Sequence, residues 1–121
     1  METGQPGSSP LDLEGFRSAM REVGVEEIVE PTLHVFVSEA AAIFDTLMAA
    51  VAEGDSESVR TAAHSLKSSS ANVRATELAE LLELVEAAAT KGDMEEVRRL
   101  SEPIGAEYRA VIAFLAESGI S

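Results

Sequence analysis

The sequence has no cysteine, no tryptophan and few aromatic residues, with one tyrosine and four phenylalanines among 121 residues. The absence of cysteine excludes disulfide bonds and thiol chemistry. Basic residues are scarce as well, because Lys and Arg number 9 against 22 Asp and Glu, which gives a net charge of −13. This charge argues against electrostatic binding to nucleic acid or to an anionic membrane.

Long apolar runs and targeting signals are also missing. The longest apolar stretch, 40–52, is interrupted by Asp45 and is shorter than the roughly 20 residues that span a bilayer. Residues 1–10 contain Gly, Ser and Pro and lack the apolar core of a signal peptide. No glycine-rich phosphate loop or kinase motif is present. We therefore expect a cytoplasmic protein without ATP-dependent kinase activity and, from its strong negative charge and few aromatics, a monomer.

The residues that are abundant, Ala, Leu, Val and Glu, favour helices over strands. We predict a flexible N-terminal tail over 1–10 and one helical domain over 11–118. Within it, apolar residues recur at spacings of three and four in five segments. These segments are 11–23, 25–52, 55–72, 75–90 and 93–117. The pattern predicts an all-α, antiparallel up-and-down four-helix bundle with a short extra N-terminal helix.

Turn signals separate the predicted helices. Gly54-Asp55 and Gly92-Asp93 each combine a helix C-terminus with an N-cap, and Glu96 occupies the capping-box position after Asp93. Pro31 either begins a helix or kinks one, and Pro103 is expected to kink or restart the last helix. The final residues, 119–121, are expected to fray.

The segment 55–72 carries the most informative residue, His64. As a helix, it places its apolar side chains on one stripe, and His64 lies on the opposite side of the helix. That stripe consists of Val59, Ala62, Ala63, Leu66, Ser70 and Val73. The spacing therefore predicts that His64 points toward solvent, whereas His34 is interpreted as an ordinary surface histidine.

Basic and small residues gather on the same side of that helix as His64. Arg60, Lys67 and Arg74 follow at seven-residue intervals in an otherwise acidic chain. Nearby cations disfavour a protonated imidazole, so we expect a neutral, nucleophilic His64. Lys67 is placed to meet a phosphoryl group on His64, one helical turn away. Small residues would let another protein approach closely, and these are Ser65, Ser68 and Ala71.

The run Ala63-His64-Ser65-Leu66-Lys67-Ser68-Ser69-Ser70, followed by Arg74-Ala75, Leu78 and Val85-Glu86, resembles the signature of histidine-containing phosphotransfer (Hpt) domains. Two positions depart from the family pattern, because Ser68 and Arg74 stand where the family often has glycine. A glycine at position 74 would end the helix with positive φ, so Arg74 must either adopt a strained backbone or keep the turn helical.

The resemblance implies that His64 carries a phosphoryl group between aspartates of receiver domains, in response regulators or hybrid histidine kinases. It implies a catalytic role for Lys67 and a docking surface that includes Arg60, Ser65, Ser68, Ala71 and Arg74. The docking face is expected to be partly apolar and to include the neighbouring helix around 40–47. The receiver would bring Mg²⁺, so no cofactor or metal site is expected in this chain.

One alternative stays open from the sequence alone. A degenerate bundle would bind a receiver or a histidine kinase as a scaffold without being phosphorylated, and Arg74 is the residue that favours this interpretation. The glutamates of the segment 75–90 offer a third possibility, a carboxylate pair for acid–base catalysis. Glutamates on an amphipathic helix usually form a solvated face, and we interpret these in that way. They are Glu77, Glu80, Glu83 and Glu86.

Overall fold

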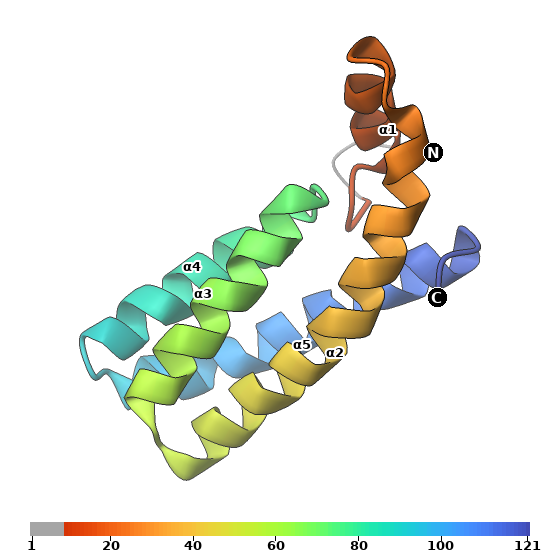
Figure 1. Cartoon of the computed structure of the whole chain (residues 1–121). Helices are drawn as coiled ribbons and strands as arrows, with labels where there is room; N and C mark the ends of the chain where they lie inside the picture. The colour runs from red at the N-terminus through yellow and green to blue at the C-terminus, as the bar shows by residue number, and fades with distance from the viewer. Residues whose placement is uncertain (1–8) are drawn as a thin grey trace, which may run out of the picture.

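The structure is a computed structural model that describes residues 9–121. A short helix, α1 (Leu13–Glu22), and a 3₁₀ turn, η2 (Glu26–Ile28), precede four long helices. These are α2 (Val29–Glu53), α3 (Ser56–Asn72), α4 (Thr76–Thr90) and α5 (Met94–Glu117). The predicted all-α bundle with a short N-terminal helix is confirmed (Figure 1). Most of the predicted tail, residues 1–8, lies outside the described residues.

The four long helices pack as neighbours in chain order, and α5 returns to lie against α2 (Figure 1). α2 and α5 have 25 and 24 residues, whereas α3 and α4 have 17 and 15. The long pair therefore extends beyond the short pair at one end of the bundle. α1 lies at that end, where Leu11 and Phe16 are buried. The position of α1 thus compensates for the unequal helix lengths.

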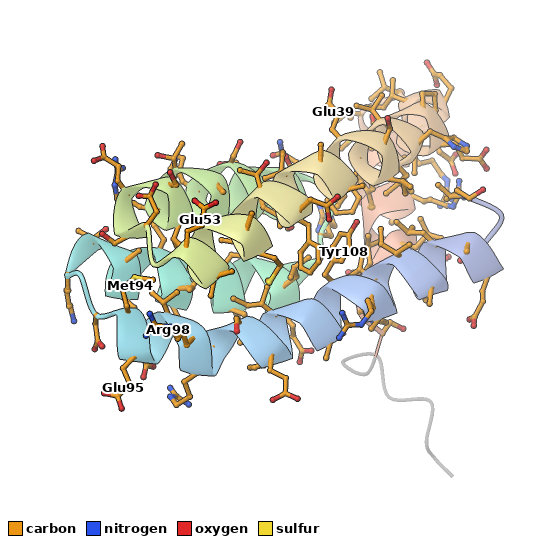
Figure 2. All side chains as sticks on the ribbon, turned by 90° about the horizontal axis from the view of Figure 1, so that it is seen from below. Glu39, Glu53, Met94, Glu95, Arg98 and Tyr108 are labelled. Atoms are coloured by element: carbon orange, nitrogen blue, oxygen red, sulfur yellow. The ribbon has the colours of Figure 1, made fainter. Side chains whose placement is uncertain are left out.

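The core is built from the apolar stripes that the sequence pattern predicts. All six residues of the predicted stripe of α3 are buried, and Val59, Ala63 and Leu66 are fully enclosed. Each buried Leu or Val side chain contributes roughly 1.5–3 kcal/mol to stability. Tyr108 of α5 is labelled in Figure 2. Its ring stacks on that of Phe44 of α2, with the ring centroids 4.2 Å apart. Tyr108 is thus a packing residue.

The predicted helix ends at the two Gly-Asp pairs are confirmed. Gly54 adopts a left-handed φ of 72° at the end of α2, and the Asp55 carboxylate accepts a hydrogen bond from the Ser58 N–H at 3.2 Å. The Asp93 carboxylate likewise accepts from the Glu96 N–H at 3.2 Å. The Glu96 carboxylate does not close the capping box, because it pairs with Arg99 one turn further along.

The prolines interrupt neither long helix. Pro31 is the third residue of α2, where a backbone N–H would lack an intrahelical acceptor, so the ring is tolerated. Pro103 lies within α5, which continues through it to Glu117. Of the two alternatives expected at Pro103, the restart is therefore wrong, and the kink stays a prediction. Packing on both sides of a proline can maintain a helix despite one missing hydrogen bond.

The expected fraying of 119–121 is also wrong. Gly119 adopts a φ of 87°, and the Ile120 N–H donates to the Leu115 carbonyl at 2.8 Å. This turn folds Ile120 back against the bundle, where only 1% of it is exposed. An apolar residue just beyond a left-handed cap often packs on the last turn of its helix.

One stretch of the described residues, Glu26–Glu53, is long and apolar enough by length and composition to cross a membrane. Its apolar content has a structural cause, because α2 forms one wall of the bundle core. Val29, Leu33 and Leu47 of this helix are 0–1% exposed. Its exposed residues include several alanines as well as polar residues such as Glu39 and Asp45.

Candidate functional site

His64 lies near the middle of α3 with 61% of its side chain exposed. The prediction that it faces away from the core is therefore confirmed. Its neighbours along the helix, Ala63 and Leu66, are buried, so the backbone that carries the imidazole is held firmly against the bundle. The result is an accessible imidazole on a rigid support.

A carboxylate from the next helix contacts both His64 and Lys67. Glu86 of α4 places Oε2 at 3.0 Å from His64 Nδ1, and its Oε1 lies 2.8 Å from Lys67 Nζ. Glu86 is 21% exposed and Lys67 is 25% exposed, so both are more enclosed than the imidazole. Glu86 thereby links the histidine and the lysine into one hydrogen-bonded cluster.

The ionisation of this cluster follows from its contacts. The hydrogen bond from Lys67 lowers the pKa of Glu86, against the opposing effect of burial, and the hydrogen bond with His64 lowers it further. The same contact with Glu86 raises the pKa of Lys67. Glu86 is therefore ionised near neutral pH and only accepts hydrogen bonds. In the neutral imidazole, this contact places the proton on Nδ1 of His64 and the lone pair on Nε2, the outer ring nitrogen.

The sequence interpretation missed Glu86 as a functional residue. It placed Glu86 on a solvated face and expected only cations around His64, whereas the nearest charged group is a carboxylate. Glu86 lies 22 residues from His64 in the chain, so helical spacing could not pair them. A signal was present in the Val85-Glu86 pair, which belongs to the matched signature.

Except for Arg60, the other predicted site residues are divided between two grooves beside His64. The first, the α2–α3 groove, includes Ser65 and is mostly small and neutral. It is lined by Ala42, Ile43, Thr46, Glu57, Ser58, Thr61, Ala62 and Ser65. Arg60 lines neither groove and pairs with Glu57 at 3.6 Å.

The second groove, the α1–α3–α4 groove, includes Lys67, Ser68, Ala71 and Arg74. Its lining is completed by Phe16, Met20, Asn72, Thr76, Ala79, Glu80 and Glu83. The structure therefore brings four of the predicted residues together on one side of His64 and places Ser65 on the other. The docking surface was predicted as one continuous surface. It consists of two grooves, one mostly small and neutral and the other with charged side chains.

Arg74 resolves the alternatives that the sequence left at the end of α3. Its φ is 66°, so the turn adopts the strained left-handed conformation. The Arg74 N–H donates to Ala71 O at 3.1 Å, and the Ala75 N–H donates to Ser70 O at 2.9 Å. This is the hydrogen-bond pattern of a Schellman motif, in which glycine is usual at the left-handed position.

Two further expectations concern metals and the second histidine. Among residues 9–121, no group of three or more His, Cys, Asp or Glu side chains is arranged to hold a metal ion. His34 is exposed on α2 and its Nδ1 lies 3.1 Å from the backbone oxygen of Ser121. His34 thus lies near the C-terminal turn and has no lysine–carboxylate cluster like that of His64.

Comparison with protein families gives a match to the Hpt domain over residues 32–116. The chain therefore belongs to the Hpt domain family. As an Hpt domain, it takes part in histidine phosphotransfer in phosphorelay signalling and is a phosphoryl carrier, not a kinase. The family interacts with receiver domains and with histidine kinases.

A solved structure supports the same assignment. The chain is similar to the crystal structure of histidine-containing phosphotransfer protein B from Pseudomonas aeruginosa PAO1, with 29% sequence identity and a TM-score of 0.76. The match covers 91% of this chain and 95% of the Pseudomonas chain. Comparison with curated protein sequences gave no match. The Hpt helix-bundle fold thus extends over nearly the whole chain.

Proposed function

We propose that His64 is the residue that carries the phosphoryl group and that Nε2 is the reacting atom. The supporting observation is the contact of Glu86 with Nδ1, which occupies the inner nitrogen and leaves the exposed Nε2 with its lone pair. Attack by Nε2 on an aspartyl phosphate forms the P–N bond as the bond between phosphorus and the aspartate oxygen breaks. The imidazole keeps its Nδ1 proton and gains positive charge, which the Glu86 carboxylate stabilises.

Lys67 acts at two stages in this proposal. Before transfer it pairs with Glu86 and holds that carboxylate ionised. When a phosphoryl group approaches Nε2, the flexible ammonium group offsets negative charge on the phosphoryl oxygens. Serine hydroxyls next to His64 donate further hydrogen bonds to this group or to the docked partner. Ser65 and Ser68 are both exposed for this purpose.

The receiver docks over the α2–α3 groove. Small side chains such as Ala42, Thr46 and Thr61 line this groove and allow a partner backbone to approach closely. Ser65 belongs to the same lining and directly follows His64 in the chain, so a partner seated there reaches the imidazole. The receiver supplies the phosphorylated aspartate and the Mg²⁺, in line with the absence of a metal-ligating cluster from the described residues.

The remaining parts of the proposal concern the whole chain. Residues 11–118 form the functional domain, with Ile120 packed against its end, and 1–10 is a tail that does not take part in transfer. The domain acts as a monomer in the cytoplasm. Its partners are receiver domains of response regulators, of hybrid histidine kinases, or of both.

A transfer assay with a panel of phosphorylated receiver domains tests the central claim. The native chain, His64→Gln and His34→Gln are incubated with each receiver, and label on the chain is followed in acid and in alkali. Acid-labile, alkali-stable label is expected on the native chain and on His34→Gln, and none on His64→Gln. His34→Gln is the matched control because it removes the other imidazole and leaves the cluster intact.

Two outcomes contradict the proposal. Equal labelling of His64→Gln and the native chain would show that another residue carries the phosphoryl group. Receiver binding without any label on the native chain would favour a scaffold that docks receivers and is not phosphorylated. Circular dichroism of His64→Gln should match the native chain, because His64 contributes little to the core.

A further inference from the structure

Arg74 is the sole non-glycine residue with positive φ within residues 9–121. The four other left-handed positions in this range are glycines, with φ between 72° and 87°. They are Gly24, Gly54, Gly92 and Gly119. Within residues 9–121, all the remaining turns of this kind have glycine, whereas this one has a long charged side chain. A strained residue of this type motivates a search for a role of its side chain.

The backbone around Arg74 does not depend on its side chain. The Schellman hydrogen bonds fix the turn from the side of α3, and the Asp12 N–H donates to the Arg74 carbonyl at 3.1 Å from the side of α1. All of these contacts join backbone atoms, and none uses the side chain of Arg74. Glycine would make the same contacts without the clash of a Cβ atom in the left-handed region. The fold alone therefore gives no reason for arginine.

The side chain of Arg74 lies on a surface that continues from His64. Arg74 and Lys67 both line the α1–α3–α4 groove, and Lys67 shares Glu86 with His64. Arg74 follows His64 by ten residues, which correspond to about 15 Å along a helix, so Arg74 lies within the footprint of a protein docked on His64.

Charge in this groove is divided between its walls. Lys67 and Arg74 follow α3, whereas Glu80 and Glu83 come from α4. Lys67 is already paired with Glu86, and Arg74 makes no ion pair with any of the described residues. α1 adds two apolar side chains to the lining, Phe16 and Met20.

We infer that Arg74 is a partner-recognition residue that pairs with a carboxylate on the receiver domain docked at His64. This inference rests on the proposed function, because it requires a receiver at that histidine. A planar guanidinium with no ion-pair partner among residues 9–121 suits bidentate binding of a carboxylate. Continuity with the His64 cluster selects the receiver as occupant over an unrelated protein. The strained turn is retained because it presents this cation at the edge of the docking surface.

The test separates the charge of Arg74 from its backbone strain. The receiver that labels the native chain fastest is titrated against the native chain, Arg74→Gln, Arg74→Lys and Arg74→Gly at low and high salt. Arg74→Gln is expected to weaken binding about threefold to fivefold at low salt, with a smaller difference at high salt. Arg74→Lys should fall between the native chain and Arg74→Gln. Arg109→Gln, which removes a charge from α5 outside both grooves, should leave affinity close to native.

Thermal unfolding of the same variants supplies the second readout. Arg74→Gly should raise Tm because it relieves the left-handed strain, yet it should lose affinity as Arg74→Gln does. Arg74→Gln should leave Tm close to native. A more stable variant that binds less well is a result that a purely structural role of Arg74 would not produce.

Several results would overturn the inference without touching the proposed function. Native affinity of Arg74→Gln and Arg74→Gly at both salt concentrations would show that the side chain has no part in docking. Dimers of the native chain that dissociate in Arg74→Gln would assign the groove to a second copy. Tighter receiver binding after removal of residues 1–8 would assign it to the chain's own N-terminal segment. Failure of the native chain to accept label would instead contradict the proposed function itself.

Discussion

The two grooves beside His64 differ in how they can recognise a partner. The α2–α3 groove is lined by small, mostly neutral side chains, and its one charged residue, Glu57, is already paired with Arg60. The α1–α3–α4 groove has Lys67 and Arg74 on one wall and Glu80 and Glu83 on the other. Shape and close approach govern binding in the first groove, whereas charge governs it in the second. The docking surface around His64 thus has two parts: binding in the first groove depends on side-chain size, and binding in the second depends on side-chain charge.

This difference has a physical consequence for specificity. Apolar and small contacts contribute affinity that is nearly independent of salt, because it comes from buried area and packing. Exposed ion pairs contribute less and are screened by salt, but they penalise partners with the wrong charge. We expect the α2–α3 groove to provide most of the affinity and the α1–α3–α4 groove to discriminate among receivers.

The largest effect is expected from a bulky charge in the α2–α3 groove. Ala42→Arg should reduce the rate of phosphoryl transfer by about tenfold or more, since an unpaired buried charge costs more than the roughly 1.4 kcal/mol of a tenfold change. Ala87→Arg on the exposed face of α4 lines neither groove and is the matched control. Rapid-quench transfer assays measure both. Equal rates for the two variants would show that receivers do not dock in the α2–α3 groove.

A smaller loss is expected when Glu86 is replaced by Gln. Without an ionised acceptor at Nδ1, the imidazole is no longer held in the tautomer with a free Nε2. Transfer should slow about fivefold, which corresponds to roughly 1 kcal/mol for one hydrogen bond. Nitrogen NMR of His64 should show a single Nδ1–H tautomer in the native chain and a mixture in Glu86→Gln.

Glu83→Gln is the control for this experiment, because Glu83 lies one turn away on α4 and lines the α1–α3–α4 groove without contacting His64. It should keep the native tautomer. An unchanged tautomer in Glu86→Gln, together with native transfer rates, would remove the positioning role of Glu86.

The cluster of Lys67, Glu86 and His64 should also make the stability of the fold depend on pH, whereas the contacts of the α2–α3 groove should not. Hydrogen bonds from Lys67 and His64 hold the pKa of Glu86 below its usual value. An acid with a lowered folded-state pKa contributes stability above its unfolded-state pKa, and this contribution is lost as pH falls through the folded-state value. The native chain should therefore be more stable than Glu86→Gln at neutral pH, and the difference should disappear in acid.

Denaturant unfolding across this pH range measures the difference, with Thr46→Ala in the α2–α3 groove as the control. The gap in unfolding free energy between Thr46→Ala and the native chain should stay constant with pH. If the gap for Glu86→Gln were equally constant, the Lys67–Glu86–His64 cluster would contribute no net stability.

The smallest effect concerns a carboxylate outside both grooves that lacks the partners of Glu86. Burial, and then the nearby Glu77, raise the pKa of Glu107, and one of its oxygens is buried without a hydrogen-bond partner in the described residues. A raised folded-state pKa means that ionised Glu107 destabilises the fold above that value. Glu107→Gln should raise Tm by about 1–3 °C at neutral pH and have no benefit in acid. Glu80→Gln, on the exposed face of α4, should leave Tm unchanged, and an equal rise in both would point to net charge instead.

Local sequence signals were sufficient to predict the helices of this fold. The Gly-Asp pairs define the beginnings of α3 and α5, and apolar spacing alone gives the buried stripe of α3 and the outward direction of His64. These features depend on residues within a few helical turns of each other, so they can be predicted from the sequence pattern. The same locality explains why the Hpt signature was recognisable, since most of it lies within one helix.

Contacts between helices could not be obtained in this way. A glutamate on an amphipathic helix has the same spacing whether it meets solvent or a histidine, so Glu86 was taken for a solvated residue. Two further features likewise depend on how neighbouring helices are rotated and offset. They are the burial of Ile120 and the separation of Ser65 and Lys67 into two grooves. The sequence by itself determined the helices, the helix ends at the two Gly-Asp pairs and the exposed histidine. Only the packing of α4 against α3 decided which charges surround that histidine, because side-chain interdigitation across the whole core sets those distances.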